Sequence, residues 1–263
     1  MNKQILNSAF LILITFFILN ATFERKTLTA NLIEKSVAKI TDDLYAGKFE
    51  VSNWLYRQFL IDLKVNHRSA DLKVAQIDSA GWLAKPIFNE PFVRSYHTDE
   101  KCDDFPVVNI SVEAANLFCN WLTEKYNSFP DKKLKSAKFI LPDEQEWILA
   151  AKGGRMNSVY SSGNSLKNDK GMFMCNFQQD GSKFVENVPN ISPDILAPVL
   201  SYWGNDLGIY NMSGNAAEMI STKGVTKGGS FKTNEDALKL DAKGNYKGSA
   251  SDIGFRYFIK IAH

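Results

Sequence analysis

The segment Gly208–Met219 holds the polar residues whose types and spacing best suit ligand binding. It reads GIYNMSGNAAEM, with an amide at Asn211 and a carboxylate at Glu218. A turn between them could aim the main-chain carbonyls of Gly214 and Ala216 at the Asn211 side-chain oxygen. Ca²⁺ binds about six to eight oxygens in proteins, so these four with water could form a calcium site of modest affinity. One carboxylate with neutral carbonyls suits calcium better than zinc or copper.

The same spacing is also typical of a tight turn that leads into a strand. Gly214 or Asn215 can adopt a positive φ, because glycine lacks a Cβ atom and asparagine tolerates the left-handed region. Spacing alone favours this simpler interpretation over a metal site. The residues by themselves leave both open.

Other chemical motifs receive little support. The three histidines are far apart and lack the H-x-x-x-H or H-x-E spacing of a zinc or iron site. The glycine pairs in AKGGR and TKGGS do not follow the phosphate-loop pattern, and a helix cap or tight turn explains each. Ser230 has no G-x-S-x-G context, so a hydrolase nucleophile is not indicated. The histidines are His67, His97 and His263.

The composition is that of an ordinary folded protein, apart from an uncharged, apolar segment near the N-terminus. The chain has 263 residues, 44% of them hydrophobic, and a net charge of +2 without long basic runs. This composition predicts one folded domain and gives no support to nucleic-acid binding. Residues 5–23 carry no charge and are followed by Glu24, Arg25 and Lys26. That pattern predicts a signal peptide within residues 1–30, cleaved after Ala21 or Ala30, with an uncleaved anchor as the alternative.

The cysteines do not define a metal or redox motif. None of the three forms a C-x-x-C pair, and an exported chain could join two of them. Cys119 lies within a helical pattern, where it could simply be part of the core. The pairing is left open for Cys102, Cys119 and Cys175.

Periodicity predicts helices mainly in the first half of the chain. Helices are expected within residues 49–64, 110–127 and 141–154, each with a recognisable start or stop signal. A short strand, KFIL, is expected between the last two helices. Residues 31–45 resemble a polar linker and residues 65–105 resemble loops. After Gly154, turn residues become dense, which predicts loops with short strands.

Eight segments together resemble the sulfatase-modifying factor family, whose founding members are formylglycine-generating enzymes. In order they read FEVSNWLYRQFL, PVVNISVEAANLFCNWL, KFILPDEQEWILAAKGG, CNF, APV, GIYNMSGNAAEM, VTKGGSF and IGFRYF. They extend over roughly residues 40–263. The resemblance implies a single compact α+β domain related to C-type lectins, loop-rich with short strands and a few helices. We assign this domain to residues 31–263.

The resemblance also implies calcium as a structural ion. Family members bind it through an asparagine, two carbonyls and a glutamate at matching positions, so the calcium interpretation of the GIYNMSGNAAEM segment is now preferred to a bare turn. The first implied site comprises Asn211, Gly214, Ala216 and Glu218. The second comprises Asn176, the carbonyl of Phe177, and Asp194.

The family's catalytic cysteines are replaced in this sequence. The oxygen-dependent enzymes of the family bind copper(I) through two cysteines that follow the motif GGS, and copper(I) prefers such soft sulfur ligands. Here KGGSFKTNEDALKL places Thr233 and Leu238 at those positions, and no cysteine follows Cys175. Copper binding and formylglycine generation are therefore not expected. We expect no catalytic residue of that mechanism in the chain.

These features favour an exported, calcium-stabilised binding or structural module at the periplasmic or outer face of the envelope. Some family members without the cysteines belong to secretion and gliding machinery, which suggests an assembly role. The expected partner is an envelope protein, or a peptide or glycan ligand, and membrane contact would come only through the N-terminal segment. The alternative is an oxidoreductase that uses iron or another cofactor without the cysteine pair.

Overall fold

The structure is a computed structural model that describes residues 27–84, 90–179 and 196–262. Residues 1–26, which form most of the expected signal or anchor segment, lie outside the described residues. Within the described ranges, the helices are too short or too polar to cross a membrane.

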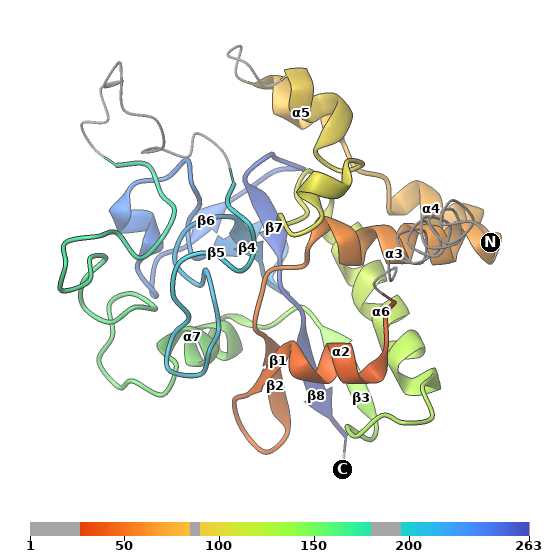
Figure 1. Ribbon diagram of the computed structural model, residues 1–263, viewed down its shortest axis with the longest axis horizontal. Coiled ribbons are helices and arrows are strands. Elements are labelled where there is room, and N and C mark those ends of the chain that lie inside the picture. The colour runs from red at the N-terminus through yellow and green to blue at the C-terminus, as the bar shows by residue number, and fades with distance from the viewer. Residues whose placement is uncertain (1–26, 85–89, 180–195, 263) are drawn as a thin grey trace, which may run out of the picture.

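Two small sheets lie at the centre of the described chain (Figure 1). The first is antiparallel throughout, whereas the second contains one parallel pair, β4 with β7. The first sheet has the order β1 (Val37–Lys39), β2 (Leu44–Gly47), β8 (Phe258–Ile261), β3 (Ala137–Ile140). The second has the order β6 (Gly244–Asn245), β5 (Val225–Lys227), β4 (Ala217–Met219), β7 (Ile253–Phe255). Only Arg256 and Tyr257 separate β7 from β8, so the chain passes directly from one sheet to the other.

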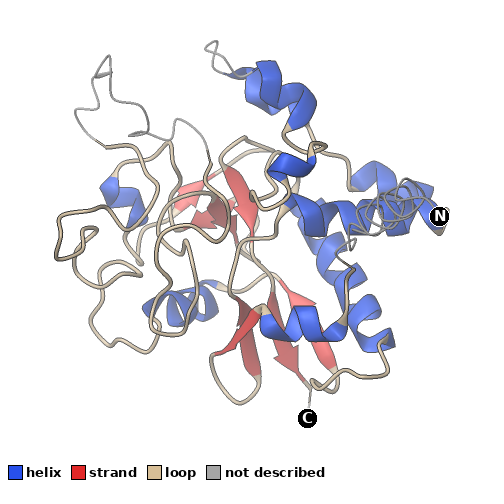
Figure 2. Cartoon of the chain, in the orientation of Figure 1, coloured by secondary structure: helices blue, strands red, loops and turns tan. Residues whose placement is uncertain are grey.

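Most of the helices lie on one side of the molecule, whereas loops dominate the other side, where α7 also lies (Figure 2). The two longest helices pack on each other through aromatic side chains, such as Phe59 against Phe118. The α-helices are α2 (Ala30–Lys35), α3 (Asn53–Val65), α4 (Ser69–Val74), α5 (Glu90–Ser95), α6 (Val112–Ser128) and α7 (Glu144–Lys152). Short 3₁₀ helices are η1 (Ser79–Ala84), η2 (Glu100–Cys102) and η3 (Glu235–Leu238).

The predicted helices and their signals are confirmed. Ser52 caps α3 and Ser111 caps α6, each by accepting a hydrogen bond from a first-turn main-chain N–H. Gly153 ends α7 with φ of 60°, the left-handed value that glycine adopts without a Cβ clash. Each of these signals involves residues only a few positions apart, so it can be recognised in the sequence. The predicted strand KFIL corresponds to β3, and the predicted loop-rich second half is also confirmed.

The linker expected at residues 31–45 is wrong, because this region contains α2 and β1 and begins β2. β2 pairs with β8, more than 200 residues later along the chain, and such a distant partner leaves no local pattern. Leu28 and Ala30, just before the expected domain start, are buried in the main core. Cleavage after Ala21 leaves both in place, whereas cleavage after Ala30 removes both.

The loops expected at residues 65–105 are corrected in part. This region contains the short helices α4 and α5 and two 3₁₀ turns. None of the residues of α4 is buried, so it lacks the apolar stripe by which a helix is recognised in sequence.

Candidate functional site

The GIYNMSGNAAEM segment forms the predicted turn. Four of its residues have positive φ: Gly208 at 70°, Asn211 at 56°, Gly214 at 86° and Asn215 at 65°. A Cβ atom on Gly214 would collide with the main-chain oxygen of Asn176, so the position requires glycine. The strand β4 follows directly, which confirms the turn-and-strand interpretation.

The carboxylate of Glu218 is paired inside the protein. It is 1% exposed and lies on β4, facing the guanidinium of Arg256 in the short link between β7 and β8. Arg256 Nη2 donates to Glu218 Oε1 at 2.6 Å, and Nε lies 3.1 Å from both carboxylate oxygens. Trp147 Nε1, from α7, donates to Oε2 at 2.8 Å. Such a bidentate, charge-assisted pair is among the strongest hydrogen-bonded arrangements in proteins.

Arg256 also joins parts of the chain that are distant in sequence. Its Nη1 donates to the carbonyl of Gly47 at the end of β2, at 2.8 Å, and its Nη2 donates to the carbonyl of Tyr210 at 2.7 Å. The guanidinium is therefore a buried cation surrounded by two carbonyls and one carboxylate. It connects both sheets to the loop of residues 208–216.

A second buried carboxyl, Glu50, supports the other side of the loop. It accepts hydrogen bonds from the amides of Asn211, at 2.9 Å, and Asn215, at 2.8 Å, and from the Ala216 main chain, at 3.3 Å. Burial raises the pKa of Glu50 to about 8; Arg256 acts in the opposite direction. The loop is thus held by Glu50, which is far away in sequence, and by Glu218, which follows the turn on β4 and pairs with Arg256.

The four residues of the first predicted calcium site match calcium in the type of their atoms but not in their charge. Glu218 offers the single carboxylate, and Arg256 already neutralises it. Asn211 directs its amide nitrogen toward Glu50. The donor set therefore does not fit calcium with the side chains in these positions. Within the described ranges, no group of three or more acidic, histidine or cysteine side chains could hold a metal. Calcium at Asn211, Gly214, Ala216 and Glu218 stays a prediction.

The second predicted site is only partly within the described residues. Asn176 is buried, and its amide donates to Asn215 Oδ1 at 3.2 Å, so it contacts the first loop. Phe177 lies in a small apolar cluster with its side chain buried. Asp194 lies outside the described residues. The structure therefore brings Asn176 and the first loop together, a link that sequence reasoning did not make.

Thr233 and Leu238, at the family's cysteine positions, both lie next to Gly229. A Cβ atom on Gly229 would come within 2.8 Å of Thr233 Oγ1 and 2.9 Å of Leu238 Cδ1. Thr233 Oγ1 accepts from the Ser230 N–H at 2.8 Å and donates to the Ser230 carbonyl at 3.1 Å. Leu238 is fully buried in a cluster with Leu166, Cys175 and Phe177. The two positions thus meet in space, with a satisfied hydroxyl and a packed aliphatic side chain.

Next to these positions is a polar cluster that sequence reasoning missed. Ser230 Oγ donates to Asp252 Oδ2 at 2.9 Å. Lys232 Nζ donates to Ser251 Oγ at 2.6 Å and lies 3.2 Å from Asp252 Oδ1. The cluster joins the GGS turn to the residues before β7. Its members lie about twenty positions apart in sequence, which hides the cluster from motif searches.

All three cysteines are free thiols. Burial raises the pKa of Cys175 to about 12 and also raises the pKa of Cys119. These two thiols are therefore protonated at neutral pH, whereas nucleophilic attack and metal ligation require the thiolate. Cys102 is partly exposed, and its pKa is also raised by burial.

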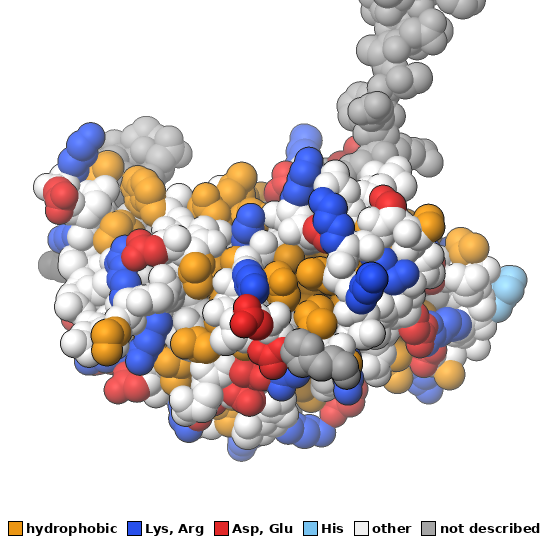
Figure 3. Space-filling view, turned by 90° about the horizontal axis from the view of Figure 1, so that it is seen from below, with side chains coloured by type: hydrophobic (Ala, Val, Ile, Leu, Met, Phe, Trp, Pro, Cys, Tyr) orange, Lys and Arg blue, Asp and Glu red, His pale blue; other side chains and the backbone are white. Residues whose placement is uncertain are grey.

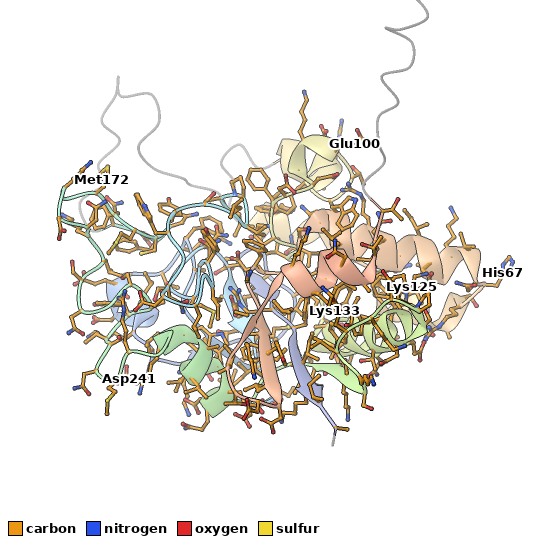
Figure 4. The ribbon with its side chains drawn as sticks, turned by 60° about the horizontal axis from the view of Figure 1, so that its bottom comes forward. His67, Glu100, Lys125, Lys133, Met172 and Asp241 are labelled. Atoms are coloured by element: carbon orange, nitrogen blue, oxygen red, sulfur yellow. The ribbon has the colours of Figure 1, made fainter. Side chains whose placement is uncertain are left out.

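The histidines do not come together. His67 lies at the outer end of α3, at the edge of the molecule (Figure 4). His97 is buried with its Nδ1 3.0 Å from Asn53 Oδ1, and burial lowers its pKa to about 4. His263 lies outside the described residues. No histidine pair suited to a metal is therefore formed by the described residues.

The two small sheets, the short helices and the loop anchored by buried carboxyl groups define a single α+β domain of the sulfatase-modifying type. The profile of the sulfatase-modifying factor enzyme 1-like domain matches residues 17–261, and the chain belongs to this family.

Relatives of this chain include both inactive and active proteins. It is 25% identical over 236 residues to the inactive C-alpha-formylglycine-generating enzyme 2 of Bos taurus, covering 82% of this chain and 70% of the relative. It is 28% identical over 179 residues to the formylglycine-generating enzyme of Bos taurus, covering 58% of this chain but only 43% of that enzyme. The solved structure of CarF has a TM-score of 0.56 at 20% identity, covering 86% of this chain and 93% of CarF. That likeness shows the shared fold alone.

Proposed function

We propose that the chain is a non-catalytic binding or structural module built on the formylglycine-generating-enzyme fold. One observation carries the proposal. Thr233 and Leu238 lie beside each other at the family's two cysteine positions, where neither offers a thiolate. Copper(I) prefers thiolate ligands, and neither a hydroxyl nor an isobutyl group can replace them.

The surroundings of these positions support the same proposal. Leu238 is buried in an apolar cluster, and the Thr233 hydroxyl both accepts from and donates to Ser230. A reacting site needs groups that can reach a substrate, and here those groups are engaged in internal packing. The similarity to an inactive relative over most of the chain is consistent with this role.

We further propose that the module is exported and acts at the periplasmic or outer face of the envelope. The uncharged segment at residues 5–23 supports export. On the face shown in Figure 3, positive and negative side chains are interspersed, as expected for a protein that does not bind nucleic acid. The partner would be an envelope protein, or a peptide or glycan ligand.

Calcium, the structural ion that the family resemblance implies, would have to share Glu218 with Arg256 in this chain. Calcium could use the oxygens of Asn211, Gly214 and Ala216, but Glu218 would have to divide its charge between calcium and Arg256. We propose that Arg256 supplies the positive charge that the loop needs. Calcium dependence is then expected to be weak.

A copper(I) titration tests the absence of the catalytic pair. The protein competes with a copper(I) chelator of known affinity, in a Cys102→Ser background that removes the partly exposed thiol. We expect no copper uptake by this protein and uptake of one equivalent by the matched variant Thr233→Cys/Leu238→Cys. Uptake of one equivalent without the added cysteines would overturn the proposal.

The second candidate is an oxidoreductase of the same family that uses iron or another cofactor. No cluster of metal-binding side chains in the described ranges favours it. Elemental analysis of the purified full chain tests it, because stoichiometric iron would support this candidate over the first.

A further inference from the structure

A cavity of 540 Å³ lies between α2, the start of α3 and the segment 198–200. This volume falls within the range of about 300–1,000 Å³ that is usual for small-molecule sites. No residue of the stretch 228–238 lines it, so it is separate from the positions at which the family resemblance expects cysteines. Its lining residues are Leu28, Leu32, Ile33, Ser36, Phe49, Glu50, Ser52, Trp54, Leu55, Asp104, Pro198, Val199, Leu200 and Tyr257.

The walls of the cavity are mainly apolar and are fixed by contacts inside the protein. Leu32 of α2 contributes to one wall, and Val199 contributes to another. The Val199 N–H donates to the carbonyl of Asp104 at 2.7 Å, and the Val199 carbonyl accepts from the amide of Asn211 at 3.1 Å. Because these bonds hold the wall in place, the cavity is preformed, as ligand sites usually are.

The hydroxyl groups of the lining are engaged with other protein groups. The Ser36 hydroxyl donates to the carbonyl of Ile33 at 2.7 Å and lies 3.0 Å from the Tyr257 hydroxyl. The Ser52 hydroxyl accepts from the N–H of Leu55 at the start of α3. An apolar ligand would leave each of these groups with its present partner.

The charges of the lining favour an uncharged ligand. Glu50 and Asp104 are acidic, and no lysine, arginine or histidine is among the described residues that line the cavity. Both Glu50 oxygens already accept hydrogen bonds from the loop 211–216, and Asp104 is exposed to water. An anion would therefore meet no cation in the cavity. A cation would have to bury its charge beside a carboxyl group whose oxygens are already used, which is unfavourable.

The loop beside the cavity presents large apolar side chains to the solvent. Leu200, which lines the cavity, is 63% exposed, and Trp203 is 52% exposed. Between them, Tyr202 has φ of 62°, a left-handed value that is unusual for a bulky residue. Strained backbone and exposed apolar side chains are both concentrated at binding sites. This loop is therefore suited to receive an apolar molecule.

We propose that this cavity binds a small, uncharged molecule that consists mainly of hydrocarbon, with the hydrocarbon packed against α2 and the start of α3. The inference rests on the proposed binding role and names the chemical class of one ligand. The copper titration does not involve the cavity, so the two proposals can fail separately.

The fluorescence of N-phenyl-1-naphthylamine, an uncharged apolar probe, measures binding to the full chain. We expect the probe to bind and to be displaced by octanol at concentrations about tenfold or more below those of octanoate and octylammonium, because burial of an unpaired charge is unfavourable. Leu32→Trp fills the cavity from α2 and should weaken the probe about tenfold or more. The matched control, Ile61→Trp, adds the same ring at an exposed position of α3 and should leave binding unchanged.

A second variant keeps the test decisive if Leu32→Trp does not fold. Leu200→Lys, at an exposed position of the lining, supplies the cation that the cavity lacks. Octanoate should then compete about threefold better relative to octanol, as expected for a partly exposed ion pair. The proposal is overturned if the full chain does not bind the probe, if octanol is not the most effective competitor, or if neither folded variant changes binding as stated.

The apolar segment at residues 5–23 is a competing occupant, because only residues 24–27 separate it from Leu28 in the lining. A chain that begins at residue 22 distinguishes the two occupants. The proposal predicts equal probe affinity for this chain and the full chain. Binding by the shortened chain alone would assign the cavity to the N-terminal segment and overturn the proposal.

Discussion

The loop at 208–219 and the stretch at 228–238 are neighbours in the fold but have different interiors. In the first, Glu218 and Arg256 form a buried ion pair, and Glu50 binds two asparagine amides. In the second, Leu238 fills an apolar cluster, and the Thr233 hydroxyl bonds to Ser230 of its own turn. The first contains long-range polar contacts that hold the fold together. The second has no thiol at the two positions where the family resemblance expects cysteines.

The contacts that hold the two sheets together and the residues at the cysteine positions therefore lie in different regions of the fold. Arg256 bonds to Gly47 in β2, to the carbonyl of Tyr210 and to Glu218 in β4, so a substitution of Arg256 would disturb both sheets. The cysteine positions contact mainly their own turn and one apolar cluster. A chain can therefore exchange the reacting groups while it keeps the frame.

The largest expected effect comes from breaking the buried pair. Glu218→Gln should lower the free energy of unfolding by about 3–5 kcal/mol, because it leaves the charge of Arg256 buried without a partner. Guanidinium chloride unfolding measures this. The matched control is Lys223→Gln, which breaks an exposed pair with Glu113 and should cause no measurable change. Equal effects of the two variants would remove the special role of Arg256.

Truncation at the second region should have a smaller effect. Leu238→Ala should cost about 3 kcal/mol, since it leaves a cavity among Leu166, Cys175 and Phe177. Thr233→Ala should cost about 1 kcal/mol through the lost turn hydrogen bonds. The same denaturant series measures both. A negligible effect of Leu238→Ala would show that this region is not closed by packing.

The pH dependence of stability separates the two regions further. The folded pKa of Glu50 is raised from 4.5 to about 8. Its contribution is therefore fully present below pH 4.5 and is lost as pH rises through about 8. Glu50→Gln lacks this loss, so its stability relative to the unsubstituted protein should improve between pH 6.5 and 8.5.

The pKa of His97 shifts in the opposite direction from that of Glu50, so the two groups affect stability in different pH ranges. Its folded pKa is lowered to about 4, so its contribution is lost only as pH falls below 6.5. Melting temperatures measured above pH 6.5 therefore report Glu50 without His97. Parallel curves for the two proteins would contradict the assignment of a buried, proton-binding carboxyl to Glu50.

Calcium should have the smallest effect. Because Arg256 already neutralises Glu218, calcium or a chelator should leave the melting temperature within experimental error. A fully formed site would behave otherwise, since a ligand at 100 times its dissociation constant stabilises by about 2.7 kcal/mol. A rise on adding calcium that disappears in Glu218→Gln would restore the calcium site.

Local features of the fold could be predicted from the sequence, but distant pairings could not. The Ser52 and Ser111 caps and the turn at Gly214 and Asn215 depend on a few neighbouring residues. The pairing of β2 with β8 depends on contacts across most of the chain. The sequence therefore predicted a turn with a carboxylate at Glu218.

The sequence did not predict the protein groups that Glu218 and Asn211 contact. The partner of Glu218 is 38 residues away, and the Glu50 carboxyl that holds Asn211 is 161 residues away. Such distant partners leave no local pattern in the sequence and appear only when the chain is folded.

The most direct test of the account is a conversion assay with a cysteine-containing sulfatase peptide. The purified protein is incubated with the peptide, copper, oxygen and a thiol reductant that supplies the remaining two electrons, and mass spectrometry detects conversion of the cysteine to an aldehyde with loss of its sulfur. A formylglycine-generating enzyme serves as the positive control. The account predicts no aldehyde above the protein-free reaction, because Thr233 and Leu238 replace the two thiolates. Aldehyde formed in proportion to the amount of this protein would contradict it.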